Sequence, residues 1–270
     1  MMPGALLGIY REQVFSPGKI RDDAAVLDAT LDELSALGWK GEAIHAEDLA
    51  PSRARPAYVL SMAQSDRVLD LLDRWTTLGT RIINTVSSIR NCYRKPLTHL
   101  LLDASIRIPP SRIVPLEDAG RAASPLLTGR LWLKRGDVHA IQAGDVVPVD
   151  SQEDLMKALD HFRSHQVRDV LIQEHAEGPV VKFYGVGPRG FFKAYLAETG
   201  EDVTSSVDHL RDIARNAARA VGLEVYGGDG VLGREDEAVL IDLNDWPSFS
   251  RCFRPAARSI AAYMKENGLF

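Results

Sequence analysis

The sequence predicts a chain that is α/β in its first third and α+β afterwards, and two patterns lead to this prediction. Short apolar runs alternate with helical patterns through residues 1–89, which is typical of parallel βαβ units. Later apolar runs come in pairs, joined by the turn-type segments GPRG and REDE, which indicates antiparallel strands. No internal repeat or low-complexity segment interrupts the 270 residues.

The first unit is expected to run strand, helix, strand, helix, strand. Leucines and alanines at helical spacing between Asp22 and Leu37 predict the first helix, and Gly38 ends it. A second helix is expected at residues 66–76. The strands are expected at residues 5–10, 57–63 and 81–85.

The remaining elements follow from the same patterns. Ser151 with Asp154 three residues later is typical of a helix N-terminus. Helices are expected at residues 91–106, 151–164, 206–222 and about 255–265. Strands are expected at residues 108–114, 129–137, 143–150, 169–178, 179–187, 190–198, 223–233 and 237–244.

Composition excludes several classes of protein. The apolar fraction is 45%, the charged fraction 26% and the net charge -5, without a basic block, which disfavours nucleic-acid binding. Cys92 and Cys252 fit no zinc or disulfide pattern and are expected to be free thiols in a reducing cytoplasm. No apolar run reaches the ~18 residues of a membrane span, and the first residues lack a signal-peptide pattern. We therefore expect a cytoplasmic protein, of unknown oligomeric state.

Oxygen-bearing side chains end two late strands. Asp242 and Asn244 are two residues apart, so they share one face of a strand, and Asp229 lies on the preceding strand. If these strands pair, three hard oxygen ligands converge, as magnesium prefers. The alternative is that all three are polar strand-end residues that face water.

Lys134 lies within the otherwise apolar run LWLKRGD. A buried ammonium is costly unless it meets an anion such as a phosphate. The alternative is an edge-strand lysine whose ammonium reaches water. The segment IQEHAEG then ends a strand in polar residues, which could offer backbone groups to a base and a carboxylate to a ribose, or could be an ordinary loop.

The order of these features is informative: Lys95, Lys134, IQEHAEG, Lys182, Asp229 and IDLN. It resembles the ATP-grasp superfamily over residues 90–270, with residues 1–89 in the place of that family's N-terminal domain. The resemblance implies ATP between two α+β subdomains, here 90–175 and 176–270. It implies these site residues: Lys95 and Lys134 at the ATP phosphates, Glu174 and His175 at adenine, Glu177 at the ribose, and Asp229, Asp242 and Asn244 at one or two magnesium ions. Lys134 and Lys182 are the implied catalytic residues.

The sequence also departs from the family. The segment KRGDVHAIQAGDVV replaces a glycine-rich phosphate loop and brings His139, which could reach a substrate or lie in solvent. Lys182 stands where the ribosomal-protein glutamate ligase branch usually has arginine, and Lys182 and IDLN look more like the inositol trisphosphate kinase branch. REQVFSPGKIR resembles a substrate loop of that branch, which makes Lys19 and Arg21 candidates.

Several further basic residues lie near predicted strand ends, by chance or as an anion site in an acidic protein. They are Arg11, Lys19, Arg90, Lys182, Lys193 and Arg251.

Three activities remain open from the sequence. A carboxylate that accepts the γ-phosphoryl group of ATP gives an acyl phosphate and a carboxylate–amine ligase, which most branches of the superfamily favour. A hydroxyl acceptor gives a small-molecule kinase, which Lys182, Lys19 and IDLN favour. A nucleotide-binding regulatory protein is the third. In either enzyme, the acceptor is expected to be a small anionic molecule and the cofactors ATP and Mg²⁺.

Overall fold

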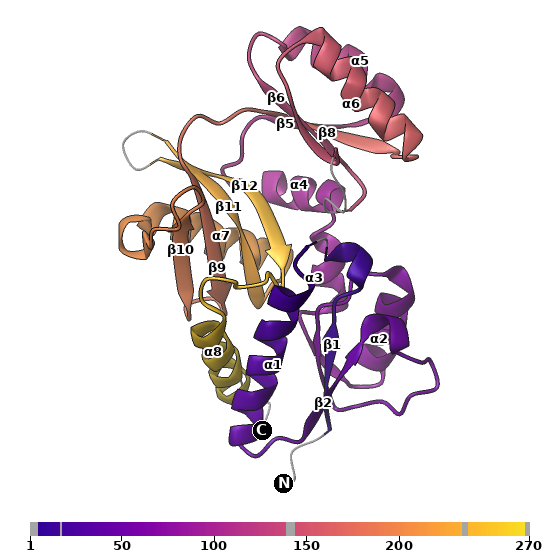
Figure 1. Cartoon of the computed structure of the whole chain (residues 1–270), viewed down its shortest axis with the longest axis vertical. Helices are drawn as coiled ribbons and strands as arrows, with labels where there is room; N and C mark the ends of the chain where they lie inside the picture. Colours follow the sequence, from indigo (N-terminus) through magenta and orange to yellow (C-terminus); the bar gives the residue numbers. More distant parts are fainter. Residues whose placement is uncertain (1–4, 17, 139–143, 234–236, 268–270) are drawn as a thin grey trace.

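A computed structural model describes residues 5–16, 18–138, 144–233 and 237–267. In these residues the chain folds around three four-stranded sheets, which follow one another along the sequence (Figure 1). The mixture of one parallel sheet and two antiparallel sheets confirms the predicted α/β and α+β class.

The first sheet is parallel, with the strand order β2-β1-β3-β4. Its elements are β1 (Leu6–Tyr10), α1 (Ile20–Ala36), β2 (Gly41–His45), β3 (Tyr58–Ser61), α2 (Asp66–Thr77), β4 (Arg81–Ile83) and α3 (Val86–Asn91). Strand β2 was missing from the prediction. Its side chains are almost all exposed at the edge of the sheet, so its sequence has no buried alternation to reveal it.

The second sheet is antiparallel, with the order β5-β8-β6-β7. Its elements are β5 (Ser111–Pro115), α5 (Leu116–Ala123), β6 (Leu131–Arg135), β7 (Val146–Val149), α6 (Gln152–Ser164) and β8 (Asp169–Glu174). The predicted cap is present, since the Ser151 hydroxyl accepts the Asp154 backbone N–H at 3.1 Å. Helices α5 and α6 share one apolar core with this sheet.

The third sheet is antiparallel, with the order β10-β9-β11-β12. Its elements are β9 (Val180–Val186), β10 (Phe192–Leu196), α7 (Asp208–Val221), β11 (Val225–Leu232), β12 (Ala238–Asp245) and α8 (Phe253–Glu266). Helix α7 ends at Gly222, whose φ of 87° suits glycine.

Two helices pack outside the segment in which they occur. Leu97 and Leu101 of α4 (Arg94–Asp103) share a core with the third sheet, not with the second. Ile260 of α8 shares a core with Leu27 of α1. Asn84 adds a polar link, because its side-chain oxygen accepts two backbone N–H groups at the start of β11, each at 2.8 Å. The boundaries at 89/90 and 175/176 therefore stay predictions.

Cys92 and Cys252 are buried free thiols, as expected. Among the helices of the described residues, none has the length and apolar character needed to cross a membrane.

Candidate active site

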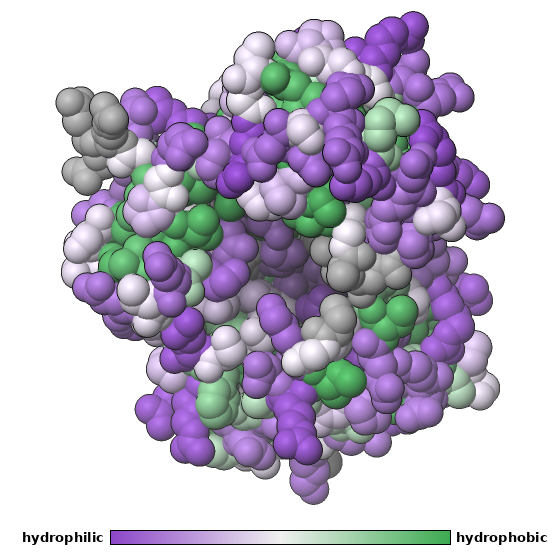
Figure 2. Space-filling view, turned by 45° about the horizontal axis from the view of Figure 1, so that its top comes forward, coloured by the Kyte–Doolittle hydropathy of each residue, from purple (hydrophilic) through white to green (hydrophobic). Residues whose placement is uncertain are grey.

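Two adjoining cavities lie where the three sheets meet. The larger, of about 420 Å³, lies between the first and third sheets, and the smaller, of about 200 Å³, lies between the second and third. Arg94, Asp229 and Asp242 line both cavities. Figure 2 shows a hydrophilic hollow in this face of the molecule, with apolar side chains nearby.

Lys134 is the buried cation of the smaller cavity. It lies on β6, which is an internal strand, so the edge-strand interpretation of this lysine is wrong. Its ammonium donates to the side-chain oxygen of Gln173 at 2.8 Å and to the backbone carbonyl of Ile241 at 3.2 Å. Burial, and next the nearby Arg94, lowers the pKa of Lys134 to about 8. In the described part of the chain its hydrogen bonds go only to these neutral acceptors, with Asp242 and Asp229 nearby, so the ammonium is suited to receive an anion.

The end of β8 forms another wall of the smaller cavity. Glu174 and His175 both line it, while their backbone N–H groups donate to the carbonyls of Pro110 (2.9 Å) and Arg130 (3.1 Å). These two residues could therefore offer a base only carbonyls and side chains. The indole N–H of Trp132 donates to Nδ1 of His175 at 3.1 Å, which places the proton of a neutral imidazole on Nε2.

Glu177 lies outside both cavities. Its side chain is 92% exposed, and its carboxylate is 3.5 Å from Nε2 of His175. Its assignment to a ribose stays a prediction.

The three predicted metal ligands lie together. Asp229 on β11 stands directly opposite Asp242 on β12, and the Asn244 side-chain amide donates to Asp242 at 3.1 Å. This bond uses the amide nitrogen, so the amide oxygen is left to face a cation. Two carboxylates and an amide oxygen fit Mg²⁺. No group of three His, Cys, Asp or Glu side chains in the described residues could hold a metal, so a Mg²⁺ ion here would need ligands in addition to Asp229 and Asp242.

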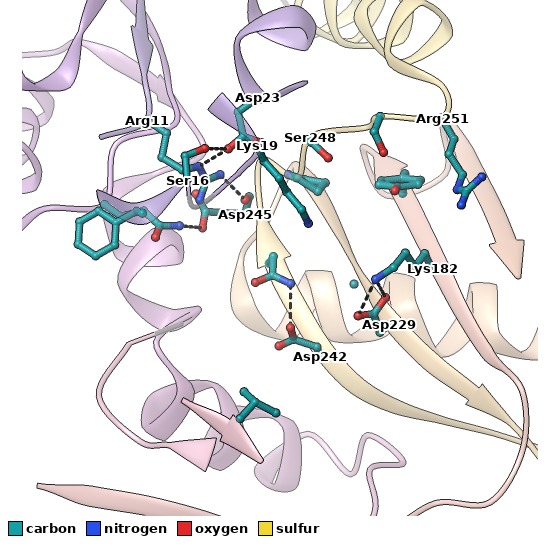
Figure 3. A pocket seen from close by; sticks show the side chains of 18 of the residues that line it. Arg11, Ser16, Lys19, Asp23, Lys182, Asp229, Asp242, Asp245, Ser248 and Arg251 are labelled. Atoms are coloured by element: carbon teal, nitrogen blue, oxygen red, sulfur yellow. Dashed lines mark hydrogen bonds and ion pairs between the residues drawn. The ribbon is translucent and has the colours of Figure 1, made fainter. Parts of the chain in front are cut away.

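Lys182 is bound to one member of this set. It faces Asp229 across the β9–β11 pairing, with its ammonium 2.9 and 3.2 Å from the two carboxylate oxygens (Figure 3). Burial opposes the charged form of Lys182, but the Asp229 carboxylate outweighs this and holds the lysine pKa above its ordinary value. Lys182 lines the larger cavity and not the smaller, so it faces the side away from Glu174 and His175.

Arg94 occupies the position where a phosphate-binding lysine was expected. Lys95 is half-exposed, pairs with Asp169 at 3.0 Å and lines neither cavity, so its role stays a prediction. Arg94 is 6% exposed and lines both cavities. Its guanidinium makes a long 3.4 Å hydrogen bond to the carbonyl of Arg135 and no ion pair with a described carboxylate. Successive side chains of a helix point about 100° apart, so Arg94 can face the cavities while the adjacent Lys95 points away from them.

The predicted substrate residues divide into two groups. Arg11, Lys19 and Arg251 line the larger cavity. Lys193 does not line it and pairs with Asp202 at 2.7 Å. Arg90 pairs with Asp70 and Asp73, and Arg21 lines neither cavity. His139 lies outside the described residues.

Sequence reasoning also missed Trp132, Gln173 and Asp245. Asp245 is fully buried and accepts a hydrogen bond from the Gln64 amide at 3.1 Å, and burial raises its pKa to about 6. The alternation along β12 could have revealed it, because Asp245 must face away from Asn244 and toward the first sheet.

Comparison with known proteins identifies the fold. No protein-family model and no curated protein matches the sequence. Solved structures match over nearly the whole chain, and one is a RimK domain protein ATP-grasp from Sphaerobacter thermophilus (TM-score 0.75, 21% identity, 96% of this chain and 98% of that one). The chain has the ATP-grasp fold. This confirms the resemblance predicted from the order of the lysines, the hinge and the strand-end acids.

Two further solved structures match at lower identity. The D-cycloserine synthetase DcsG matches with a TM-score of 0.74 at 16% identity, covering 98% of this chain and 100% of that one. A D-alanine–D-alanine ligase from Bacillus anthracis complexed with ATP matches with a TM-score of 0.72 at 12% identity, covering 98% and 100%.

Proposed function

We propose that this chain is a Mg-ATP-dependent carboxylate–amine ligase. It would transfer the γ-phosphoryl group of ATP to the carboxylate of a small anionic molecule, and an amine would then displace the phosphate to form an amide. The similar structures include a synthetase and a ligase, the latter complexed with ATP, which supports this class.

The observation that carries the proposal is the junction between the two cavities. Arg94, Asp229 and Asp242 line both, so a nucleotide in the smaller cavity would present its terminal phosphate to a molecule in the larger one. Reacting groups held side by side need little further ordering to react.

The residues at the junction suit phosphoryl transfer, in which catalysis is mostly positioning and charge stabilisation. Lys134 would bind phosphate oxygens from the nucleotide side, and Arg94 would bind the group in transfer. Asp229, Asp242 and Asn244 would hold Mg²⁺, which when bound would supply positive charge to the phosphate oxygens. Lys182 would stabilise negative charge from the acceptor side.

The choice of ligase over kinase rests on the described lining of the larger cavity, which offers no histidine and, apart from the proposed metal ligands, only carboxylates that are already engaged or sealed from solvent. A hydroxyl acceptor must lose a proton, whereas a carboxylate attacks without losing one. No histidine lines the larger cavity in the described part of the chain. Asp23 is engaged by the Ser16 hydroxyl and lies 3.5 Å from Arg11, and Asp245 is sealed from solvent.

An ADP-release screen against amino acids, small peptides and inositol phosphates tests the proposal. Hydroxylamine in the assay converts an acyl phosphate into a hydroxamate, and phosphorus NMR identifies a stable phosphate ester. A hydroxamate or an amide product supports the ligase, and an ester indicates the kinase. ATP binding without ADP release indicates a regulatory protein.

A further inference from the structure

Besides Arg94 at the junction, two cations of the larger cavity have no anionic partner among the described residues. Lys182 pairs with Asp229, and Arg11 lies 3.5 Å from Asp23. Lys19 and Arg251 form no ion pair and no side-chain hydrogen bond with any residue that the structure describes. The chain has 37 acidic and 32 basic residues. The missing ion pairs of Lys19 and Arg251 therefore do not come from a shortage of acidic residues in the chain.

The backbone before Arg251 is anchored, while the side chains of Arg251 and Lys19 are both exposed. Arg251 follows Trp246 and Phe249, which are fully buried and anchor the segment after β12. Its guanidinium lies against Gly200, where a Cβ would approach Nη1 to 2.1 Å. Glycine at this position therefore leaves the space that the arginine occupies.

Lys19 comes from the other side of the cavity, at the N-cap of α1, and Figure 3 shows its side chain directed into the pocket. In this view Lys19, Ser248 and Arg251 lie along the top of the pocket, while Lys182, Asp229 and Asp242 lie below them. Ser248 and Ser250, which also line the cavity, add hydroxyl donors.

These positions separate two kinds of anion binding. The carboxylate that receives the phosphoryl group must lie at the junction lined by Arg94, Asp229 and Asp242. Lys19 and Arg251 line only the larger cavity, so they are placed for a different group of the same molecule. Cationic side chains with hydroxyl donors recognise carboxylates and phosphates.

Resting on the proposed function, we infer that the acceptor carries a second anionic group, a carboxylate or a phosphate, which lies on the side of the larger cavity that Lys19 and Arg251 make positive. The substrate class is thus a small dianionic acid.

Calorimetric titration with matched probes tests this inference. The pairs are butyrate with succinate, valerate with glutarate, and glycerate with 3-phosphoglycerate, each measured with and without magnesium and a non-hydrolysable ATP analogue. At least one dianion is expected to bind about tenfold more tightly than its partner, and the pair that shows this distinguishes carboxylate from phosphate. Lys19→Gln and Arg251→Gln should each reduce the preference, and the double variant should remove it. Affinity for the ATP analogue should stay within about twofold of wild type.

Lys193→Gln is the matched control, because this lysine pairs with Asp202 and does not line the cavity. It should leave the preference unchanged. Equal binding of every pair, no binding of any probe, or a preference that survives the double variant would overturn the inference. Failure of the ATP analogue to bind would reject the proposed function instead. In that case the titrations without nucleotide still measure the preference between the paired probes, so the two failures can be told apart.

Discussion

Replacing Arg94 by methionine tests whether this arginine, rather than the adjacent Lys95, binds the phosphates. Arg94 is 6% exposed, lines both cavities and pairs with no carboxylate among the described residues. Its guanidinium donors are therefore available to a ligand. The Lys95 ammonium is half-exposed and already pairs with Asp169.

The expected effect follows from the bonds that are lost. A hydrogen bond from a charged group contributes about 1.5–3 kcal/mol, so losing one should cut kcat/KM by about 10- to 150-fold, and losing two by more. Melting temperature should fall little, because methionine keeps much of the aliphatic volume and removes a buried cation without a carboxylate partner. Arg94→Lys should recover part of the activity, since it restores the charge without the planar fork.

The assay is steady-state ADP release with ATP titration, alongside a thermal melt. Lys95→Met is the matched control, and loss of its exposed ion pair should cost at most about 1 kcal/mol of stability and leave kcat/KM nearly unchanged. The reasoning is refuted if Lys95→Met impairs ATP use strongly while Arg94→Met does not.

Three further predictions concern the remaining site residues. Wild-type ATP affinity, measured by calorimetry, should fall as the pH rises through about 8, because Lys134 must be protonated to bind phosphate. Lys134→Arg should flatten this pH dependence, and a variant with the same pH profile as wild type would contradict the assignment. Asp242→Asn and Asn244→Ala should each lower turnover by more than about 100-fold with the fold retained in circular dichroism, whereas normal turnover at saturating magnesium in both would remove the metal assignment. Lys182→Ala should lower kcat by about 100-fold and Lys182→Arg should restore only part; if both changes act on the acceptor KM alone, Lys182 contacts only the acceptor.

Elements with a buried face were predictable from the sequence. Helix α7 shows this, because its apolar residues recur at helical spacing and Gly222 ends it. Strand β2 and helix α5 were not predicted. The side chains of β2 face solvent, so its sequence has no buried alternation, and α5 (LEDAGRAA) is only eight residues long, with small residues and an internal glycine.

The candidate site was predictable where its geometry is local. Asp242 and Asn244 share a face by strand periodicity, and one hairpin brings Asp229 beside them. The choice between Arg94 and Lys95 depends instead on the rotation of α4. Leu97 and Leu101 fix that rotation by packing on the third sheet, and helical spacing places Arg94, three and seven residues before them, on the same buried face, a signal that the prediction did not use.

The acceptor side was least predictable because it forms between distant segments. Lys19 precedes α1 and Arg251 precedes α8, and they reach one cavity because these two helices pack together, with Leu27 and Ile260 in a common core. The smaller cavity draws its described lining only from residues 94–242, which belong to α4 and the second and third sheets. The nucleotide and acceptor sides thus depend on different packing contacts and meet only at the junction. If the proposed roles hold, substitutions at Lys19 or Arg251 alter the acceptor class without disturbing the residues proposed for ATP, and the strand-end motifs then predict the nucleotide chemistry but not the substrate.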